Sequence, residues 1–384
     1  MYVATAKLTR LRLLLAVPGN VVALGAVSLV TDISSEMVTA VLPYYLVLVV
    51  GLSPLAFGLV DGLYFGVTAL VRLASGYAAD RWQRRKLVAG LGYGLSALSR
   101  LGLLAAGASV PALGAAVAVD RAGKGLRTAP RDALISLSAE PGQQGQAFGV
   151  HRAMDTVGAF LGPLAAFGLL ALGGAYDLVF VASFALGALG VVLLVLYVRD
   201  AVPARVPVPV PAGPVATLAT VTPPPAPRPS LRLPTDRRFR RILLLACLFG
   251  LVTLSDSFIY LLLQDRVEPA FFPLLPLGTA LAYLLLAVPV GRLADRFGRM
   301  RVFLAGHGLL ALLYVLLAVN ASPLAVLVLL GLFYAATDGV LMAAVGPLLP
   351  DATRASGLAW VQTGQAVARM LSSILFGLAW TVLG

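Results

Sequence analysis

The sequence predicts an all-α polytopic membrane protein, and three observations lead to this fold class. The chain has 384 residues and is 59% hydrophobic but only 12% charged, whereas soluble domains carry about 25% charged residues. Its apolar residues come in long runs, each near the roughly 20 residues that cross a bilayer as a helix. The runs are continuous rather than alternating, so helices are favoured over a membrane β-barrel.

About eleven apolar runs are expected to form transmembrane helices. They are residues 19–49, 53–79, 86–107, 111–137, 145–173, 176–198, 241–264, 270–295, 300–319, 323–350 and 355–384. Glycine is frequent inside them, which membrane helices tolerate because small residues let helix backbones pack closely.

A proline-rich segment divides the chain. Residues 201–235 contain repeated Val-Pro pairs and the run PPPAPRP, and they show no helical period. Such composition favours extended chain. We therefore expect a six-helix bundle over residues 1–200, a cytoplasmic linker over 201–239 and a five-helix bundle over 240–384. A partner-binding role for the proline motifs is the other interpretation of the linker.

The formal net charge is +12, which in a soluble protein would suggest nucleic acid, but here the position of the charge decides. Basic residues gather in alternate loops, with Arg266 as the exception in the intervening ones. They are Lys7, Arg10, Arg12, Arg81, Arg84, Arg85, Lys86, Arg237, Arg238, Arg240, Arg241, Arg296, Arg299, Arg301 and Arg354. Basic loops are typically cytoplasmic. We expect a multi-pass protein of the cell (inner or plasma) membrane, with a cytoplasmic N-terminus and no nucleic-acid partner.

Three further features of the sequence argue against a cleaved signal peptide, a disulfide and a metal site. Residues 1–20 are basic and then apolar but lack a clear cleavage site, so we interpret them as mature protein. Cys247 is the only cysteine, which excludes an intrachain disulfide. One cysteine and two histidines argue against a His/Cys metal cage, and we expect no metal site and no cofactor. His151 and His307 are interpreted as packing or interfacial residues rather than ligands.

The loop after the second run is repeated after the eighth. The matching pairs are Gly76 with Gly291, Asp80 with Asp295, Arg81 with Arg296, and Arg84 with Arg299. A repeat at corresponding places predicts two pseudo-symmetric bundles around a central pathway.

These loops resemble the pattern G-x-L-A-D-R-x-G-R of the major facilitator superfamily. The second copy follows it from Gly291 to Arg299, and the first departs at Ala78 and Gln83. The segment 121–125 is similar to the family's R-x-x-Q-G motif with lysine in place of glutamine, and 158–163 is similar to its antiporter motif G-x-x-x-G-P. The segment 32–37 resembles a poorly characterised subfamily of transporters. The resemblance implies the superfamily's two-bundle fold, a role for Arg121 in proton transfer, and efflux.

The family usually has twelve helices, so the resemblance implies that a twelfth is missing here. Residues from Ala355 onward resemble those from Ala147 onward, which makes the last run the partner of the fifth. Two explanations for the missing helix remain: the chain is truncated, or a second subunit covers the exposed groove.

Ionisable residues inside the runs are functional candidates, because an unpaired charge at bilayer depth costs several kcal/mol. Proton-coupling or substrate roles are predicted for Asp32, Glu36, Arg121, Lys124, Arg152, Asp155, Asp256, Asp338 and Arg369, in a wider set that includes Arg72, Arg100, Asp120 and Arg127. Asp32 and Glu36 are four residues apart and share a helix face. Two carboxylates in a poorly hydrated site favour proton uptake. The alternative is a set of permanent ion pairs with arginines of the fourth or fifth run.

Arg121, Lys124 and Arg127 form a basic stripe on the fourth run. It suits proton coupling, an anionic substrate, or charge balance with Asp32, Glu36 and Asp120. Arg152 and Asp155, three residues apart, are expected to pair with each other. Asp338 precedes Gly339 mid-run, where a helix can loosen.

Two further groups have mechanical roles. The loop residues Gly76, Asp80, Arg81, Arg84, Gly291, Asp295, Arg296 and Arg299 are predicted to latch the cytoplasmic side, with membrane anchoring as the simpler alternative. Gly158, Gly162 and Pro163 are predicted to bring two helices close together and to kink one of them.

The sequence thus predicts a secondary active transporter that works by alternating access, most simply by proton-coupled efflux of a small solute. A carrier of anions or divalent metal cations and a non-transporting receptor are the alternatives. No catalytic motif is present, so we expect no enzyme and no catalytic residue. The expected partners are a small-molecule or ion substrate, protons and the lipid bilayer, with a monomeric chain. The substrate site is expected between the first, fourth, fifth, seventh, tenth and eleventh runs, with Asp32 or Glu36 paired to Arg121 or Arg152.

Overall fold

The computed structural model describes residues 17–82, 84–139, 143–200, 236–349 and 354–383, without the side chains of residues 72–82, 144, 145 and 354–356. Helices account for nearly all of these residues. The predicted fold class, an all-α polytopic membrane protein with about eleven helices, is confirmed.

The N-terminal half contains six long helices. They are α2 (Gly19–Tyr44), which continues as the π-helical turn η1 (Tyr45–Val49), α3 (Pro54–Trp82), α4 (Arg85–Ala106), α5 (Val110–Ser138), α6 (Gln144–Ala171) and α7 (Tyr176–Tyr197). Ten helical segments of the described chain are long and apolar enough to cross a membrane. α5 is not among them, because charged residues interrupt its apolar sequence, yet it packs between α3 and α4 inside the bundle.

The C-terminal half contains a broken helix and four long ones. They are α8 (Arg237–Val252) with α9 (Asp256–Leu262), then η2 (Gln264–Arg266), η3 (Pro269–Leu274), α10 (Leu275–Phe297), α11 (Arg299–Ala318), α12 (Pro323–Val345), η4 (Gly346–Leu348) and α13 (Arg354–Leu383). The linker expected over 201–239 lies outside the described residues up to 235. α8 begins earlier, at Arg237, because the Asp236 carboxylate accepts a hydrogen bond from the Phe239 amide at 2.8 Å.

Gly298 makes the tight turn between α10 and α11. Its φ of +102° is one that side-chain-bearing residues rarely adopt. This backbone conformation gives a physical reason for the glycine in the second copy of the repeated loop.

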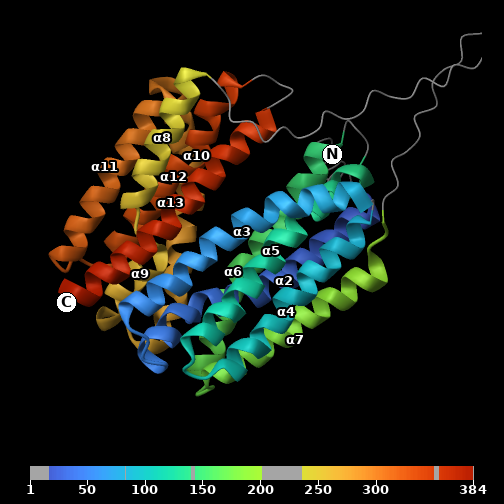
Figure 1. Ribbon diagram of the computed structural model, residues 1–384, viewed down its shortest axis with the longest axis horizontal. Helices are drawn as coiled ribbons and strands as arrows, with labels where there is room; N and C mark the ends of the chain where they lie inside the picture. The colour runs from blue at the N-terminus through green and yellow to red at the C-terminus, as the bar shows by residue number, and fades with distance from the viewer. Residues whose placement is uncertain (1–16, 83, 140–142, 201–235, 350–353, 384) are drawn as a thin grey trace, which may run out of the picture.

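Figure 1 shows the helices of the two halves side by side, blue to green beside yellow to red. Within the N-terminal half, α2 packs on α6 and α7, and α4 packs on α5 and α7; within the C-terminal half, α12 packs on α10 and α11. Between the halves, α3 packs on α13, and η3 packs on α6 and α2.

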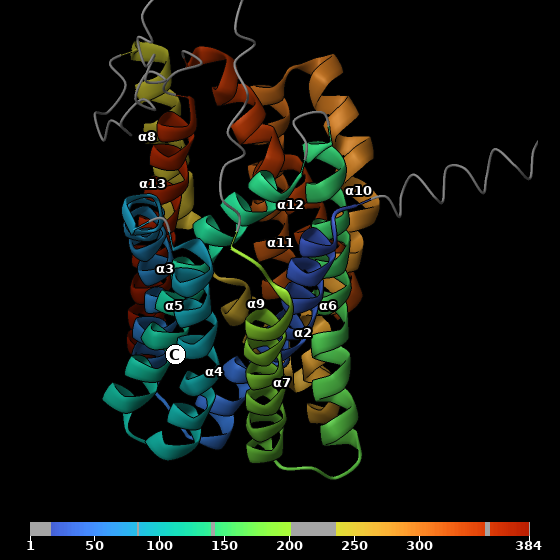
Figure 2. The ribbon, with the colours of Figure 1, turned by 90° about the vertical axis from the view of Figure 1, so that its right-hand side faces the viewer.

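The two ends of the bundle differ. We call the end that holds Tyr197 and Arg237 the linker end, and the end that holds η3 and Leu383 the far end (Figure 2). At the far end one apolar core joins both halves, for example through Phe57 and Phe258, whose ring centroids are 4.9 Å apart. At the linker end each half has a separate core. The halves are therefore joined at the far end.

Candidate functional site

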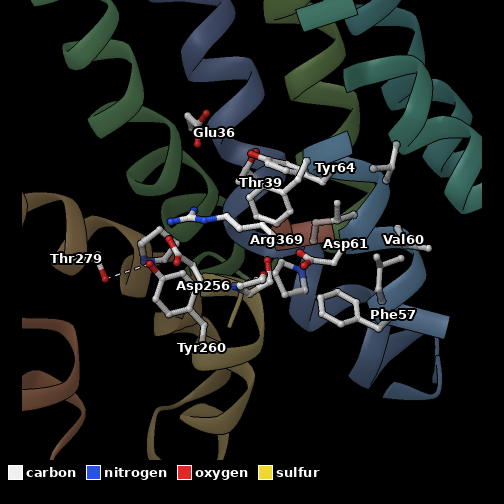
Figure 3. Close-up of a pocket in the computed structure, with 18 of the residues that line it drawn as sticks. Glu36, Thr39, Phe57, Val60, Asp61, Tyr64, Asp256, Tyr260, Thr279 and Arg369 are labelled. Atoms are coloured by element: carbon white, nitrogen blue, oxygen red, sulfur yellow. Dashed lines mark hydrogen bonds between the residues drawn. The ribbon is translucent and has the colours of Figure 1, made fainter. Parts of the chain in front are cut away.

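A cavity of about 360 Å³ lies between the two halves, in the size range of small-molecule sites. Its lining comes from α2, α3, α5, α9, α10, α12 and α13. The described residues of the fifth long helix, α6, do not line it, whereas the second and eighth do, which corrects the expected set of lining helices. The charged lining residues are Glu36, Asp61, Asp256, Asp338 and Arg369. Figure 3 shows Asp61, Asp256 and Arg369 together, with Glu36 apart from them.

The seventh span is broken at residues 253–255, next to this cavity. Other helices satisfy the backbone groups that the break frees: the Leu254 amide donates to the Tyr314 hydroxyl at 2.9 Å, and the Ser372 hydroxyl donates to the Thr253 carbonyl at 2.9 Å. Ser255 then caps α9. The break places Asp256 at the first turn of α9, facing the cavity.

The expectation that the helix loosens at Asp338-Gly339 is wrong. α12 runs unbroken from Pro323 to Val345, and its neighbours α10 and α11 pack along it, although Gly339 itself is exposed with open space beside it. Asp338 is exposed to the cavity and makes no ion pair or hydrogen bond with the described residues.

Asp256 and Arg369, the other two site residues predicted in the C-terminal half, are linked through the side chain of Tyr334. The Tyr334 hydroxyl donates to Asp256 Oδ1 at 2.5 Å, and Arg369 Nη1 lies 3.5 Å from the Tyr334 oxygen. The Arg369 guanidinium also lies 5.5 Å from the ring centroid of Tyr334 and 5.9 Å from that of Phe65. Asp256 and Arg369 are therefore coupled through a tyrosine.

Asp61 of α3 is a residue that the sequence analysis missed. It is 7% exposed, and its Oδ2 accepts a hydrogen bond from Ser373 of α13 at 2.7 Å. The hydroxyls of Ser255 and Ser257 also hydrogen-bond to it. One carboxylate of the N-terminal half is thus held by three serines of the C-terminal half. The available signal was an aspartate inside an apolar run.

Asp32 and Glu36 form ion pairs with α5. Asp32 Oδ1 lies 3.4 Å from Arg127 Nη2, and Glu36 Oε1 lies 3.6 Å from Lys124 Nζ. The expected partners Arg121 and Arg152 are wrong. α2 and α5 run antiparallel, so a step from Asp32 to Glu36 matches a step from Arg127 back to Lys124, and Arg121 lies a turn beyond.

Arg121 has its own carboxylate. Arg100 and Arg121 both bind Asp120, and the Arg121 guanidinium lies 3.9 Å from the Tyr64 ring centroid. Both arginines are buried. The two guanidinium groups on this side of α5 therefore share one carboxylate of the N-terminal half.

A second cluster joins α5 to α6. Arg131 lies 3.1 Å from Asp132 and 3.7 Å from Asp155, and Asp155 also lies 3.7 Å from Arg152. The Asp155 carboxyl also lies beside the Asp32 carboxyl. Arg131 was missed by the sequence analysis, although its position four residues after Arg127 continues the basic stripe.

His151 also belongs to this region. Its Nε2 lies 2.8 Å from the Ser28 hydroxyl, which is 3.4 Å from Arg131 Nη1. His307 instead packs among aromatic rings, 4.0 Å from Phe249 between ring centroids.

Gly158 and Gly162 let α6 lie directly against the acidic face of α2. A Cβ at Gly158 would lie 2.5 Å from the Leu29 carbonyl oxygen, and one at Gly162 would lie 2.7 Å from the Glu36 Cβ. Pro163 follows inside α6, which stays helical through it. Side chains larger than hydrogen would separate the two helices at Asp32 and Glu36.

The repeated loops are described in part. The side chains of Arg72, Gly76, Asp80 and Arg81 lie outside the described residues, and Arg84 is exposed before α4. In the second copy, which begins near Gly291 of α10, Arg299 lies 2.9 Å from Asp295 and donates to the Ala343 carbonyl at 2.8 Å. Arg296 lies 5.5 Å from the ring centroid of Phe297. These contacts stay within the C-terminal half, so a latch between the halves stays a prediction.

Two helical bundles around a charged central cavity form the architecture of a membrane transporter. The sequence profile of the Major Facilitator Superfamily matches residues 24–268 and 266–384, and the chain belongs to this family. An uncharacterized MFS-type transporter of Methanocaldococcus jannaschii is 30% identical over 377 residues, which cover 94% of this chain and 89% of the relative. The chain is therefore a transporter and not an enzyme, as the sequence predicted.

Solved structures show the same fold. The nucleoside transporter NupG has a TM-score of 0.73 and 15% identity, over 95% of this chain and 91% of NupG. A bacterial homolog of the human lysosomal transporter Spinster, in an inward-facing and occupied conformation, has a TM-score of 0.72 and 18% identity, over 94% and 81% of the two chains.

Proposed function

We propose that this chain is a proton-coupled antiporter that exports a small solute by alternating access. The observation that carries the proposal is the close approach of the Asp32 and Asp155 carboxyls, beside Arg127 and Arg131. Two carboxyl groups that share a poorly hydrated site favour a proton on one of them, because two negative charges there repel. The pair is therefore a site where one proton is held and released.

Proton release would change the contacts of α2. With both carboxyls ionised, Asp32 and Asp155 repel each other, and each draws more strongly on Arg127 or Arg131. Glu36 lies one turn from Asp32 on the same helix and lines the cavity. Because glycines hold α2 tightly against α6, a shift at Asp32 is transmitted to Glu36 as a movement of the helix.

The ends of the bundle support alternating access. A second cavity of about 240 Å³ continues from Tyr64 and Phe65 past Lys124 to Ala359, toward the linker end. The far end is closed by a core that both halves share.

The basic residues at the linker end support a cytoplasmic position for that end in a cell membrane. Arg237, Arg238, Arg240 and Arg241 begin α8 there. The protein would then be open to the cytoplasm in this state. The G-x-x-x-G-P segment of α6, which resembles the antiporter motif, supports export.

Flux in proteoliposomes tests the proposal. A pH dye is trapped inside, and organic cations, organic anions and divalent metals are added outside in turn. We expect a compound-dependent pH change in the wild type that is lost in Asp32→Asn and Asp155→Asn. Asp265→Asn, an exposed acid in η2, is the matched control and should behave as the wild type.

Solute exchange without a proton gradient separates coupling from folding. The two carboxyl variants should still exchange radiolabelled solute, because their cavities keep their lining. An unaltered pH signal in the double variant Asp32→Asn, Asp155→Asn would refute proton coupling at this pair.

A further inference from the structure

We infer that the central cavity takes an organic cation, with its positive group held between the Asp338 carboxylate and the Tyr283 ring. The inference deepens the proposed transport function by assigning a substrate class. It starts from the charges that line the cavity, where four carboxylates face one guanidinium.

Three of the four carboxylates already have partners. Glu36 pairs with Lys124 at 3.6 Å, and Asp61 accepts a hydrogen bond from Ser373 at 2.7 Å. Asp256 accepts one from Tyr334, behind which Arg369 lies. Asp338 is the acid in the cavity that makes no ion pair or hydrogen bond with the described residues, and Arg369 attracts it only from a distance. Its exposed carboxylate is therefore open to a positive group that enters the cavity.

Three of the aromatic rings that line the cavity already face a guanidinium. Tyr64 faces the guanidinium of Arg121, and Phe65 and Tyr334 face that of Arg369. These contacts show that the walls already hold planar cations by cation–π attraction. Tyr283 lines the cavity close enough to feel the charge of Asp338, and it faces none of the described cations.

Tyr334 provides a second aromatic ring near Asp338. It lies four residues before Asp338 in α12, so both side chains are on the same helix face toward the cavity. Tyr283 comes from α10, which packs along α12. A carboxylate with a ring from each of two adjacent helices is suited to an ammonium, phosphonium or guanidinium group that carries apolar substituents.

An anion fits this cavity poorly. It would face Asp338, Asp256 and Asp61, and Arg369 is already engaged with Tyr334 and Phe65. Like charges close to one another repel and so oppose binding of an anion. Selection between cation and anion should therefore be strong and should depend on Asp338.

Two probes of the same shape and opposite charge test the inference: tetraphenylphosphonium and tetraphenylborate, with phenyltrimethylammonium as a smaller cation. Binding is measured by equilibrium dialysis on the full chain in nanodiscs, with empty nanodiscs subtracted. We expect one of the two cations to bind at least tenfold more tightly than tetraphenylborate. Asp338→Asn should weaken that binding at least tenfold, and Asp265→Asn should leave it unchanged.

Conservative variants keep the test valid if Asp338→Asn folds poorly. Asp338→Glu keeps the charge and Tyr283→Phe keeps the ring, so both variants should still bind the cation. Tyr283→Leu should bind it several-fold more weakly. Equal or tighter binding of tetraphenylborate overturns the inference. Failure of both cations to bind also overturns it. The inference is likewise overturned if Asp338→Asn, shown to be folded by its unfolding temperature, binds the cation as tightly as the wild type.

The cation-binding test and the test of proton-coupled transport can give independent results. Asp32→Asn and Asp155→Asn should bind the cation normally, since neither residue lines the cavity. Cation binding without any transport-linked pH change would support this inference and refute proton coupling. Proton-coupled flux of an anion would do the reverse.

Discussion

In the N-terminal half, four buried arginines each face a carboxylate of the same half, whereas the C-terminal half sends its charges into the cavity. The four are Arg100, Arg121, Arg127 and Arg131. In the other half, Asp256 and Arg369 meet through Tyr334, and Asp338 stays open to the cavity. A network of paired charges stabilises a bundle and moves as a unit, while a charge without an ion-pair partner favours a ligand. This difference is why we propose coupling in the N-terminal half and solute contact at the cavity face of the other.

The largest effect expected from this difference is the loss of Asp120. Asp120→Asn removes the carboxylate that Arg100 and Arg121 share, at 2% and 3% exposure of the two arginines. Breaking a buried ion pair from one side costs about 3–5 kcal/mol. We expect a clear fall in the unfolding temperature in detergent.

Asp338→Asn is the control in the other half, because it removes a carboxylate without a described partner. Its unfolding temperature should stay near that of the wild type or rise. Equal losses in the two variants would show that the halves do not differ in how they hold charge.

The helices themselves could be predicted from the sequence, because length and hydropathy determine a membrane span. Even α5 was expected, although its charges interrupt the apolar run. The break before Asp256 left a local signal, since Ser255 followed by an acid is a typical helix start. We expected a loosened helix at Asp338-Gly339 because glycine weakens helices, but α12 continues through both residues. A single glycine inside a long helix lowers its stability without breaking it.

The partners within the candidate site could not be predicted in the same way. The four-residue spacing of Asp32 and Glu36 fixes their common face, but not the register of α5 against it. The position of α5 depends on close packing against a third helix: α5 approaches α4 at Gly92 and Gly123, where an added Cβ would lie under 3 Å from neighbouring backbone atoms. Such tertiary packing, which the spacing of residues on α2 does not contain, decides whether Asp32 and Glu36 meet Arg127 and Lys124 or Arg121.

A smaller effect is expected where the two halves meet. Asp61→Asn weakens the hydrogen bonds from the serines of α9 and α13 and so loosens the far end. Hydrogen bonds to a charged group contribute about 1.5–3 kcal/mol, which is enough to shift the balance of states more than tenfold toward opening at the far end. Spin labels at Ala108 and Glu268, exposed at the far end of each half, measure the change by their distance distribution.

The labels need a background without Cys247, the single native cysteine, so Cys247→Ser is the parent. Ser373→Ala removes one donor and should shift the distances in the same direction by less. Unchanged distances in Asp61→Asn would mean that the apolar core around Phe57 and Phe258 holds the far end closed without help from this carboxylate.

The smallest effect tests how far the network of paired charges in the N-terminal half extends. Arg152 is 64% exposed, while its partner Asp155 keeps Arg131 at 3.7 Å and stays beside Asp32. Exposed ion pairs contribute about 0–1 kcal/mol. Arg152→Ala should therefore change the free energy of unfolding by less than about 0.5 kcal/mol and leave the pH signal in proteoliposomes intact, whereas Asp155→Asn should abolish that signal. If Arg152→Ala also abolished it, the network that holds the proton would reach the surface of α6, and the contrast between a closed N-terminal network and an open C-terminal cavity would no longer hold.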